Sequence, residues 1–289
     1  MATISTAVFK ENLFNGKVLF CTGGGSGICK AMTEAVMRHG ANAFIIGRKL
    51  DRLAKSAAEL SNATGRQCGY AAADVRNPVL IKEAVEKCVA QFGRIDFVIC
   101  GAAGNFLTTI DAMSENAFRT VLEIDTIGTF ITIKATLPHV RATRGSYILM
   151  SAILYDRGLA YQAHAAAAKA GVDALGRVVA VEEGPRGVRC NSIAPGPIRD
   201  TEGFDRLTVG TPEDVDNSAK SRVPLQRYGA VADIANCGVF LFSDAANWIT
   251  GQLIAVDGGE LHTNMGMVPN YPANVLEPAT MASVIKGKL

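Results

Sequence analysis

The chain has 289 residues, of which 48% are hydrophobic and 19% charged, and its formal net charge is +2. The apolar share excludes a largely disordered chain and suffices for a substantial core, whereas the near-neutral charge gives no reason to expect a nucleic-acid or membrane-surface partner. No apolar run reaches the roughly 18 residues of a membrane-spanning helix, and residues 1–10 lack the pattern of a signal or transit peptide.

Short apolar runs alternate with longer amphipathic segments along most of the chain. Continuous apolarity within a run is typical of parallel strands that are buried on both faces. The predicted strands are 18–21, 43–46, 67–73, 97–100, 147–150, 188–193 and 253–256. The predicted helices are 28–39, 53–60, 79–92, 117–140, 161–183 and 231–243. This alternation predicts an α/β fold with one Rossmann-type, doubly wound parallel sheet and right-handed crossovers.

The length allows one or two domains, but the chain shows no internal repeat and no low-complexity linker. We therefore predict a single domain over residues 1–289, with its core at about 14–260. The polar stretch 201–224 is interpreted as a lid-like insertion. The stretch 261–289, which carries three prolines, is interpreted as an irregular tail.

The seven cysteines are odd in number, show no C-x-x-C spacing and mostly lie in apolar stretches. This pattern indicates packed free thiols in a reducing compartment rather than disulfides or a zinc site. No metal site is predicted.

A glycine-rich segment, Thr22 to Cys29, joins the first predicted strand to the first predicted helix. Glycines allow a tight turn there and let a pyrophosphate approach the backbone at the N-terminus of a helix. The alternative is a bare structural turn, but strand, loop and helix occur in the order that a dinucleotide site requires. We therefore predict cofactor contacts from Thr22, Gly23, Gly25, Ser26, Gly27 and Ile28.

Gly47, Arg48 and Lys49 follow the second predicted strand. Enzymes that prefer NAD usually carry a carboxylate near this point for the ribose 2′-hydroxyl, whereas cations suit a 2′-phosphate. Arg48 therefore predicts NADPH as the cofactor. The alternative is a solvated helix start, since Asp51 and Arg52 follow.

Read together, these residues resemble the short-chain dehydrogenase/reductase family. Its T-G-x-x-x-G-x-G loop is matched by Thr22, Gly23 and Gly27, with Cys29 in place of the last glycine. An acidic pair after the third strand, a P-G-x-x-x-T loop and the end of the last strand are also similar, at Asp74-Val75, Pro195 to Thr201 and Asp257-Gly258-Gly259. The match covers about residues 14–260. It implies further cofactor contacts at Asp74, Val75, Gly101, Ala102, Lys169, Pro195, Gly196, Ile198 and Thr201.

Departures from the family pattern are more informative than the matches. The tyrosine of the family's catalytic Tyr-x-x-x-Lys motif would precede Lys169 by four residues, where this chain has Ala165. Asp125 stands in place of a helix asparagine, and Gly101 to Gly104 replace Asn-Asn-Ala-Gly. The set resembles one branch, the peroxisomal 2,4-dienoyl-CoA reductases, and is closest to its fungal members. The resemblance implies NADPH-dependent reduction of 2,4-dienoyl-CoA to 3-enoyl-CoA in peroxisomal β-oxidation of unsaturated fatty acids.

The missing phenol agrees with that chemistry. A ketone reductase must protonate an alkoxide, whereas hydride addition to the distal end of a dienoyl thioester leaves an extended enolate that takes its proton on carbon. Our hypothesis is that Lys169 orients the nicotinamide ribose and, with Asp125, polarises the water that delivers this proton, as the resemblance also suggests. Asn105 and Ser151 are candidate donors to the enolate oxygen, and Phe106 is a candidate contact for the acyl chain.

These assignments have structural alternatives. Asp125 could cap or pair within a helix, Lys169 could be a solvated helix lysine, and Ser151 could simply end a strand. His164 is interpreted as a packing or hydrogen-bonded residue rather than a catalyst.

Two tyrosines keep rival functions open, because Tyr155 or Tyr161 could loop back as a substitute phenol. The chain would then be a short-chain reductase of another enone or ketone in fungal secondary metabolism. A third interpretation is a non-catalytic NADP-binding protein, although the retained Lys169 and Asp125 argue against it.

The last three residues, Gly287-Lys288-Leu289, resemble the Ser-Lys-Leu address that the peroxisomal import receptor reads. They predict that receptor as a partner, beside the acyl-CoA substrate, and a peroxisomal rather than cytoplasmic location. The alanine-rich segment 163–170 allows close helix–helix approach, and by resemblance we expect a homo-oligomer. The alternative for this segment is packing within the chain.

Overall fold

The computed structural model describes residues 3–154, 158–207 and 211–263. Seven parallel strands form one sheet in the order β3-β2-β1-β4-β5-β6-β7. The strands are β1 (Val18–Thr22), β2 (Asn42–Gly47), β3 (Cys68–Ala72), β4 (Phe97–Cys100), β5 (Ser146–Met150), β6 (Arg189–Pro195) and β7 (Leu253–Val256). Chain order reverses between β1 and β4, which is the point in a doubly wound sheet where ligands bind.

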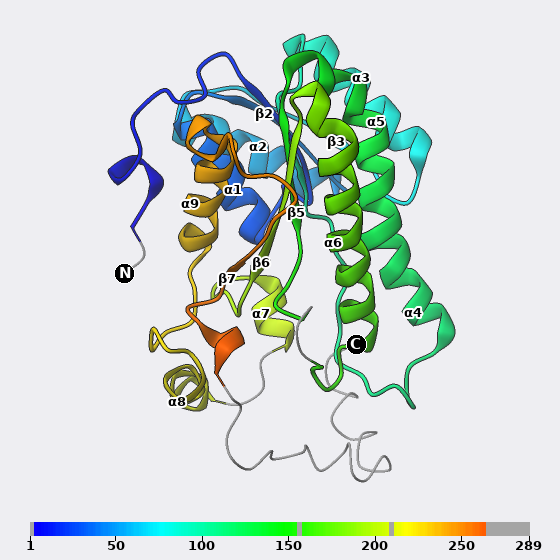
Figure 1. The fold of residues 1–289 in the computed structure, drawn as a ribbon, viewed down its shortest axis with the longest axis vertical. Coiled ribbons are helices and arrows are strands. Elements are labelled where there is room, and N and C mark those ends of the chain that lie inside the picture. Colours follow the sequence, from blue (N-terminus) through cyan, green and yellow to red (C-terminus); the bar gives the residue numbers. More distant parts are fainter. Residues whose placement is uncertain (1–2, 155–157, 208–210, 264–289) are drawn as a thin grey trace.

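Helices cover both faces of the sheet (Figure 1). They are α1 (Gly27–Arg38), α2 (Leu50–Thr64), α3 (Pro78–Phe92), α4 (Glu115–Leu122), α5 (Gly128–Thr143), α6 (Ala163–Glu183), α7 (Glu202–Leu207), α8 (Pro212–Arg222) and α9 (Val231–Phe242). On one face α1 packs against α2 and α9, and on the other α5 packs against α3 and α6. The fold class predicted from the sequence is therefore confirmed.

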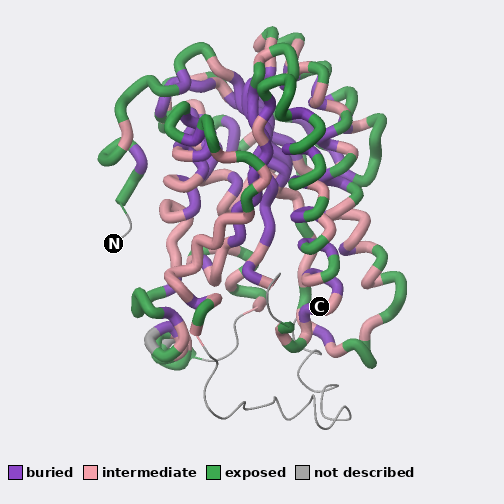
Figure 2. The backbone as a smooth tube through the Cα atoms, viewed as in Figure 1, coloured by how far each residue is buried: buried purple, intermediate pink, exposed green. Residues whose placement is uncertain are grey.

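Burial on both faces explains why the strands are continuously apolar. In β1, Leu19 and Cys21 belong to the core beneath α1 and α9, whereas Val18 and Phe20 belong to the core beneath α3 and α5. All five residues of β1 are buried, and the buried backbone concentrates along the sheet (Figure 2). A strand without a solvent-facing side has no position for the alternating polar residues of a half-exposed strand.

The seven predicted strands and most predicted helices are confirmed to within a few residues at their ends. One prediction is wrong: the segment 117–140 is not a continuous α-helix. It divides into α4 and α5 around a π-helical turn, Glu123–Ile127. The physical reason lies at Asp125, which is buried in this turn and contacts Gly104 and Lys169 outside it. The wider π-helical turn directs the Asp125 side chain toward these two partners.

The predicted lid-like insertion contains the short helices α7 and α8. The predicted tail is described only to residue 263, through a helical turn at Glu260–His262. Tyr155 and Gly287-Lys288-Leu289 lie outside the described residues. Within the described residues no helix combines the length and apolarity needed to cross a bilayer, and no group of three or more metal-ligating side chains occurs there.

Candidate active site

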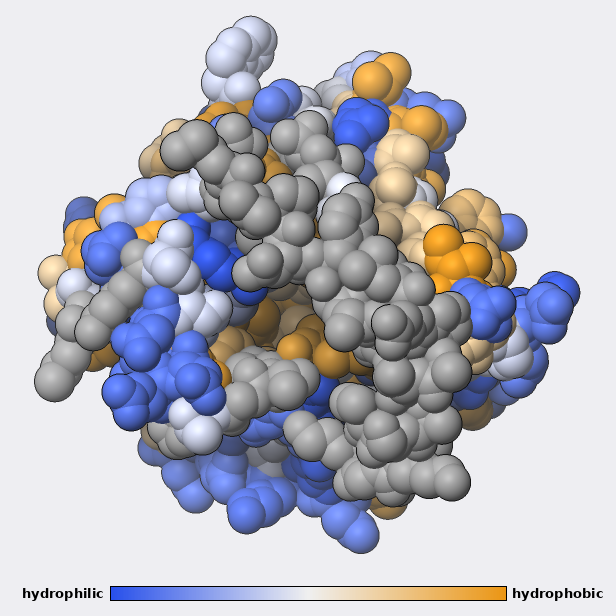
Figure 3. Space-filling model, turned by 90° about the horizontal axis from the view of Figure 1, so that it is seen from below, coloured by the Kyte–Doolittle hydropathy of each residue, from blue (hydrophilic) through white to orange (hydrophobic). Residues whose placement is uncertain are grey.

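The sequence-predicted site residues converge at the carboxyl ends of β1, β4, β5 and β6. Parallel strands place the loops that follow them at one edge of the sheet, so motifs far apart in the chain meet there. Seen from that end, the surface is hollowed, and apolar side chains are visible inside the hollow (Figure 3).

The loop between β1 and α1 has the geometry of an anion site. Gly23 adopts a φ of 71°, which side-chain-bearing residues rarely adopt, and a Cβ on it would lie 2.9 Å from the carbonyl oxygen of Gly101. Both the backbone conformation and the lack of space therefore exclude a larger residue at this position. The N-cap residue of α1, Ser26, forms no side-chain cap, and the first turn of α1 contains no acidic residue. The free N–H groups and the helix dipole at this end therefore favour a bound phosphate group.

Thr22 joins this loop to the neighbouring loop after β4. Its buried Oγ1 accepts hydrogen bonds from the backbone N–H groups of Gly101 at 2.9 Å and Ala102 at 3.1 Å. One side chain thus fixes two predicted cofactor-binding segments relative to each other.

Cys29 and Gly101 form a pair of compensating departures from the family motifs. A Cβ added at Gly101 would overlap the Sγ atom of Cys29. The thiol of α1 therefore occupies the space in which any larger residue at position 101 would place its side chain. In the sequence, Cys29 and Gly101 are two separate departures from the family motifs. Their contact in the structure explains why both occur in the same chain.

The end of the site near β2 and β3 is positively charged. Arg48 is exposed directly after β2. Asp74 after β3 is held by Arg76 at 2.7 Å, and this guanidinium holds the pKa of Asp74 below its usual range, with a smaller contribution from the charge of Arg48. Val75 is buried, with its side chain against Gly128. The predicted pair Asp74-Val75 thus lies beside Arg48, but its carboxylate is already neutralised.

The loop after β6 reaches back over the glycine loop. Gly196 donates its N–H to the carbonyl of Val256 at 3.1 Å, which fixes the loop against β7. Thr201 bonds to the carbonyl of Ile198 at 2.9 Å and caps α7. The side chain of Thr201 lies 3.8 Å from where a Cβ on Gly27 would be. The predicted loop Pro195 to Thr201 and the N-terminus of α1 therefore enclose one space.

The centre of the site is an ion pair between Asp125 and Lys169. Their Oδ2 and Nζ atoms are 3.0 Å apart, and the residues are 1% and 8% exposed. Asp125 Oδ1 accepts the N–H of Gly104 at 2.8 Å, and Lys169 Nζ donates to the carbonyl of Met150 at 2.8 Å. An ammonium has three hydrogens, so these two partners among the described residues leave one for a further acceptor.

The position of the missing phenol is filled by packing. Ala165 is 2% exposed. The preceding residue, His164, is fully buried, and its ring lies 4.2 Å from that of Phe106 between centroids. Burial lowers the pKa of His164, opposed by the negative charge of Asp125. Its predicted packing role agrees with this contact, and Phe106 is exposed enough to face a ligand.

The two candidate enolate donors already have partners. Asn105 donates its amide to Gln162 at 2.8 Å, while its own oxygen is buried without a hydrogen bond among the described residues. Ser151 donates its hydroxyl to Asp173 at 2.9 Å. Because a hydroxyl has a single hydrogen, this contact competes with the predicted role of Ser151.

Asp173 is the site-associated residue that the sequence analysis missed. It is 2% exposed, and burial raises its pKa, opposed by the hydrogen bond from Ser151 and the charge of Lys169. Its spacing of one helical turn from Lys169 was a signal, since side chains four residues apart share a helix face. Through Ser151, Asp173 fixes the end of β5 whose carbonyl at Met150 accepts from Lys169.

Comparisons with known proteins agree with this geometry. A family model described as Enoyl-(Acyl carrier protein) reductase matches residues 23–260. A peroxisomal 2,4-dienoyl-CoA reductase [(3E)-enoyl-CoA-producing] of Saccharomyces cerevisiae is 40% identical over 289 residues, which is 99% of this chain and 96% of that protein. The enzyme of the same description from Danio rerio is 44% identical over 255 residues, which is 88% of this chain and 84% of that protein. A solved short-chain type dehydrogenase/reductase from Mycobacterium ulcerans has a TM-score of 0.83 and 31% identity, covering 96% of this chain and 99% of that structure.

The contact between positions 29 and 101 predicts a coupled pair of substitutions. Gly101→Ala should lower the free energy of unfolding by about 1–3 kcal/mol, because it overpacks the buried thiol. In a Cys29→Ala background the same change should cost clearly less, since the Sγ atom is gone. Urea unfolding of the two single variants and the double variant measures this coupling.

Gly104→Ala serves as the control, because its Cβ would meet the flexible end of Ile124 instead of Cys29. Its cost should be the same in both backgrounds. An equal cost for Gly101→Ala in both backgrounds would contradict the compensation.

The burial of Asp173 predicts a pH-dependent stability difference. Because its pKa is raised in the folded chain, the native state holds this proton more tightly than the unfolded state. Its contribution to stability is therefore present below the ordinary aspartate pKa of about 3.9 and is lost as pH rises through the folded value. Asp173→Asn keeps an acceptor for Ser151 but does not titrate.

The unfolding free energy of Asp173→Asn, relative to wild type, should therefore increase as pH rises from acid to neutral. Chemical denaturation at several pH values measures the difference. A relative stability that instead falls with rising pH would show that the Asp173 carboxylate is favoured in its charged form.

Proposed function

The chain belongs to the short-chain dehydrogenase/reductase family, and we propose that it is an NADPH-dependent 2,4-dienoyl-CoA reductase that forms 3-enoyl-CoA in the peroxisome. The curated relatives named for this activity support the proposal along nearly the whole chain. The observation that carries it is the buried Asp125–Lys169 pair beside Ala165, in a site that retains the family's lysine and lacks its phenol.

The absent phenol separates this reaction from carbonyl reduction. Hydride addition to a ketone places charge on oxygen, which requires an acid positioned at that oxygen. In a dienoyl thioester, the hydride saturates the distal carbon, carbon 5, and the negative charge is shared by carbon 4, carbon 2 and the thioester oxygen. The 3-enoyl product forms when carbon 2 is protonated. A proton source at carbon is therefore needed, and the buried Ala165 supplies no acid at the position of the family's phenol.

The residues of the nucleotide site suit NADPH. When bound, this cofactor supplies the hydride that the distal diene carbon receives. The N-terminus of α1 would hold the pyrophosphate, because its free N–H groups face a loop in which added Cβ atoms at Gly23 and Gly24 would clash with neighbouring atoms. Arg48 would hold the 2′-phosphate, which explains why a cation follows β2.

Asp125 and Lys169 together provide the proton through water. The two side chains are paired with each other at 3.0 Å, so we assign the role of the acid to a water held beside them. Lys169 is aimed by Asp125 and by the carbonyl of Met150, and its third hydrogen is available to a water or to the nicotinamide ribose. A water polarised between the two charges would deliver the proton to carbon.

The acyl group would lie along the loop after β4. Asn105 is positioned by Gln162, and the amide hydrogen that Gln162 does not use would face the thioester oxygen. Phe106 is 37% exposed and is supported from behind by His164, so its ring would form one wall for the acyl chain.

Location and assembly follow from the relatives and the surface. The relatives named above are peroxisomal, which supports the address read in Gly287-Lys288-Leu289 and its import receptor. The structure packs Ala165 and Ala168 inside the chain, so the alanine-rich segment offers only part of its surface to another copy. Exposed apolar side chains on or next to α5 and α6 would contribute to the homo-oligomer expected from the resemblance, namely Ile127, Phe130, Val178 and Val181.

Replacing either member of the central pair should remove activity with different effects on the cofactor. With NADPH and 2,4-hexadienoyl-CoA, Asp125→Asn should lower kcat by about a hundredfold or more, because water loses its polarising carboxylate, while NADPH binding persists. Lys169→Met should lower kcat and also weaken NADPH binding. Both are measured by NADPH absorbance and by fluorescence titration of NADPH.

Exposed residues of the same types provide matched controls, namely Asp244→Asn and Lys134→Met. Neither should change kcat. If Asp125→Asn turns over like the wild type, the pair does not deliver the proton. If the wild type binds NADPH but reduces no dienoyl-CoA, the activity itself is wrong, and a panel of ketones and enones is the next assay.

Cofactor choice should depend on Arg48. Arg48→Ala should raise the KM for NADPH about tenfold or more, because a charge-assisted contact to the 2′-phosphate is lost, and should leave the KM for NADH unchanged. Lys55→Ala, an exposed cation on α2, is the control. An equal rise for both cofactors would indicate a general structural effect instead of 2′-phosphate recognition.

A further inference from the structure

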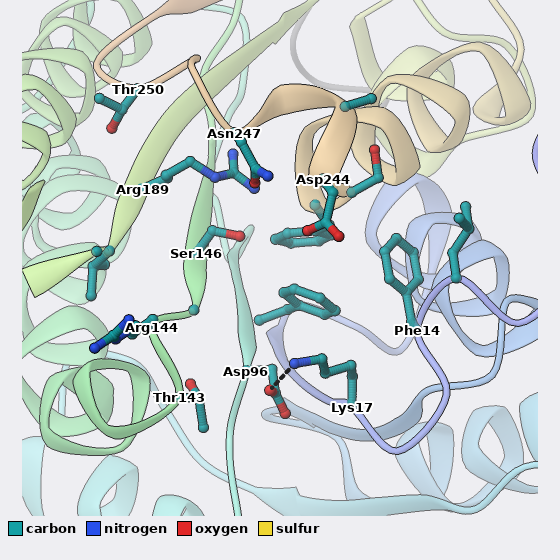
Figure 4. Close-up of a pocket in the computed structure, with 18 of the residues that line it drawn as sticks. Phe14, Lys17, Asp96, Thr143, Arg144, Ser146, Arg189, Asp244, Asn247 and Thr250 are labelled. Carbon is teal, nitrogen blue, oxygen red and sulfur yellow. Dashed lines mark ion pairs between the residues drawn. The ribbon is translucent and has the colours of Figure 1, made fainter.

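A cavity of about 670 Å3 is shown in Figure 4. It lies at the edge of the sheet opposite the candidate active site. It is formed where β4, β5 and β6 begin, together with the segment before β1 and the turn between α9 and β7. Its volume lies within the range of small-molecule sites, about 300–1,000 Å3. The reaction proposed above uses only the carboxyl ends of the strands, so it gives this cavity no role.

One wall of the cavity is aromatic and rigid. Phe97 and Phe242 are stacked with ring centroids 4.6 Å apart, and Phe14 meets Phe97 edge-on at 5.1 Å. All three are buried. Trp248 lines the same cavity and is fully exposed, so the aromatic wall continues to the surface and can take an apolar ligand body.

The facing wall holds polar groups with unused bonding capacity. Ser146 is 3% exposed, yet its hydroxyl has no hydrogen-bond partner within the described part of the chain. Among the same residues, the side chain of Arg189 makes one hydrogen bond, a long one of 3.5 Å to the carbonyl of Ile249. Burial lowers the pKa of this guanidinium, opposed by the charge of Asp244. A buried donor left without a partner costs free energy and calls for an explanation such as a ligand.

The charges around the cavity favour an anion. Its charged lining residues are Lys10, Lys17, Arg144, Arg189, Asp96 and Asp244. Asp96 is already neutralised by Lys17 at 3.2 Å and Arg94 at 2.6 Å. The remaining lining charges are three cations against Asp244, which is exposed. A carboxylate would therefore meet a net positive field at the polar wall.

We propose that this cavity binds an amphipathic monocarboxylate, with its carboxylate on Arg189 and Ser146 and its apolar body against Phe97 and Phe242. Arginine presents two parallel N–H groups to a carboxylate, and the serine hydroxyl supplies a third donor. Figure 4 shows Arg189 and Ser146 on neighbouring strands, and Phe97 and Phe242 line the same cavity. The site is separate from catalysis, because these strands carry the reacting groups at their other ends.

The single tryptophan of the chain makes the proposal directly measurable. Decanoate, kept below its micelle-forming concentration, should produce a saturable blue shift of Trp248 fluorescence as the cavity mouth loses water. Decanol, which has the same alkyl chain without the charge, should bind at least about tenfold more weakly, since it lacks the charge-assisted contacts.

Two variants separate a ligand site from a structural role. Arg189→Met and Ser146→Ala should each weaken decanoate binding, the first by about tenfold or more. Neither should lower thermal stability without ligand, because the groups removed make a single long bond or none among the described residues. Lys82→Met, which removes an exposed cation on α3, is the control and should bind decanoate like the wild type.

Three results would overturn the proposal. One is the absence of any saturable fluorescence change with decanoate. The second is equal binding of decanol, which would show only apolar association. The third is unchanged decanoate binding by both Arg189→Met and Ser146→Ala, which would place the bound decanoate elsewhere on the chain.

Discussion

The buried ion pair between Asp125 and Lys169 is the constraint on which the rest of the site depends. Taking two charges out of water is costly, and a pair stripped of one partner typically loses about 3–5 kcal/mol. The chain offsets this cost with fixed hydrogen bonds on both sides, from the N–H of Gly104 to the aspartate and from the lysine to the carbonyl of Met150. The π-helical turn at Glu123–Ile127, the loop after β4 and the end of β5 are therefore all positioned by the same two side chains.

Departures from the family pattern are physically linked. In the proposed mechanism, Ala165 supplies no acid for oxygen, and the carboxylate of Asp125 would act on water instead. The Sγ atom of Cys29 on α1 occupies the space that a side chain at Gly101, in the loop after β4, would need. Loss of the catalytic tyrosine alone would not require a buried carboxylate at Asp125 paired with the retained Lys169.

The sequence predicted the sheet well because its strands are buried on both faces, which makes them continuously apolar and easy to recognise. Asp125, Lys169 and the nucleotide loop stood out in the sequence because each belongs to a local motif with fixed spacing, and the structure places Asp125 and Lys169 in contact. Prediction from the sequence failed where the outcome depends on contacts between distant segments. The π-helical turn, Glu123–Ile127, is only five residues long, too short for its wider hydrogen-bond spacing to change the sequence pattern visibly. The hydrogen bond between Ser151 and Asp173 forms only when β5 and α6 are packed. The cavity with Ser146 and Arg189 is lined by segments between Phe9 and Thr250 that are far apart in the sequence, and no sequence pattern marks it.

Whether the proton comes from water or from a substitute phenol is tested most directly in a variant with both Tyr155 and Tyr161 changed to Phe. The assay is turnover of 2,4-hexadienoyl-CoA with NADPH in D2O, followed by NMR of the product. A water polarised by Asp125 and Lys169 predicts turnover close to that of the wild type and one solvent deuterium at carbon 2 of a 3-enoyl product. Loss of turnover with NADPH binding intact would contradict it and assign the proton to a tyrosine.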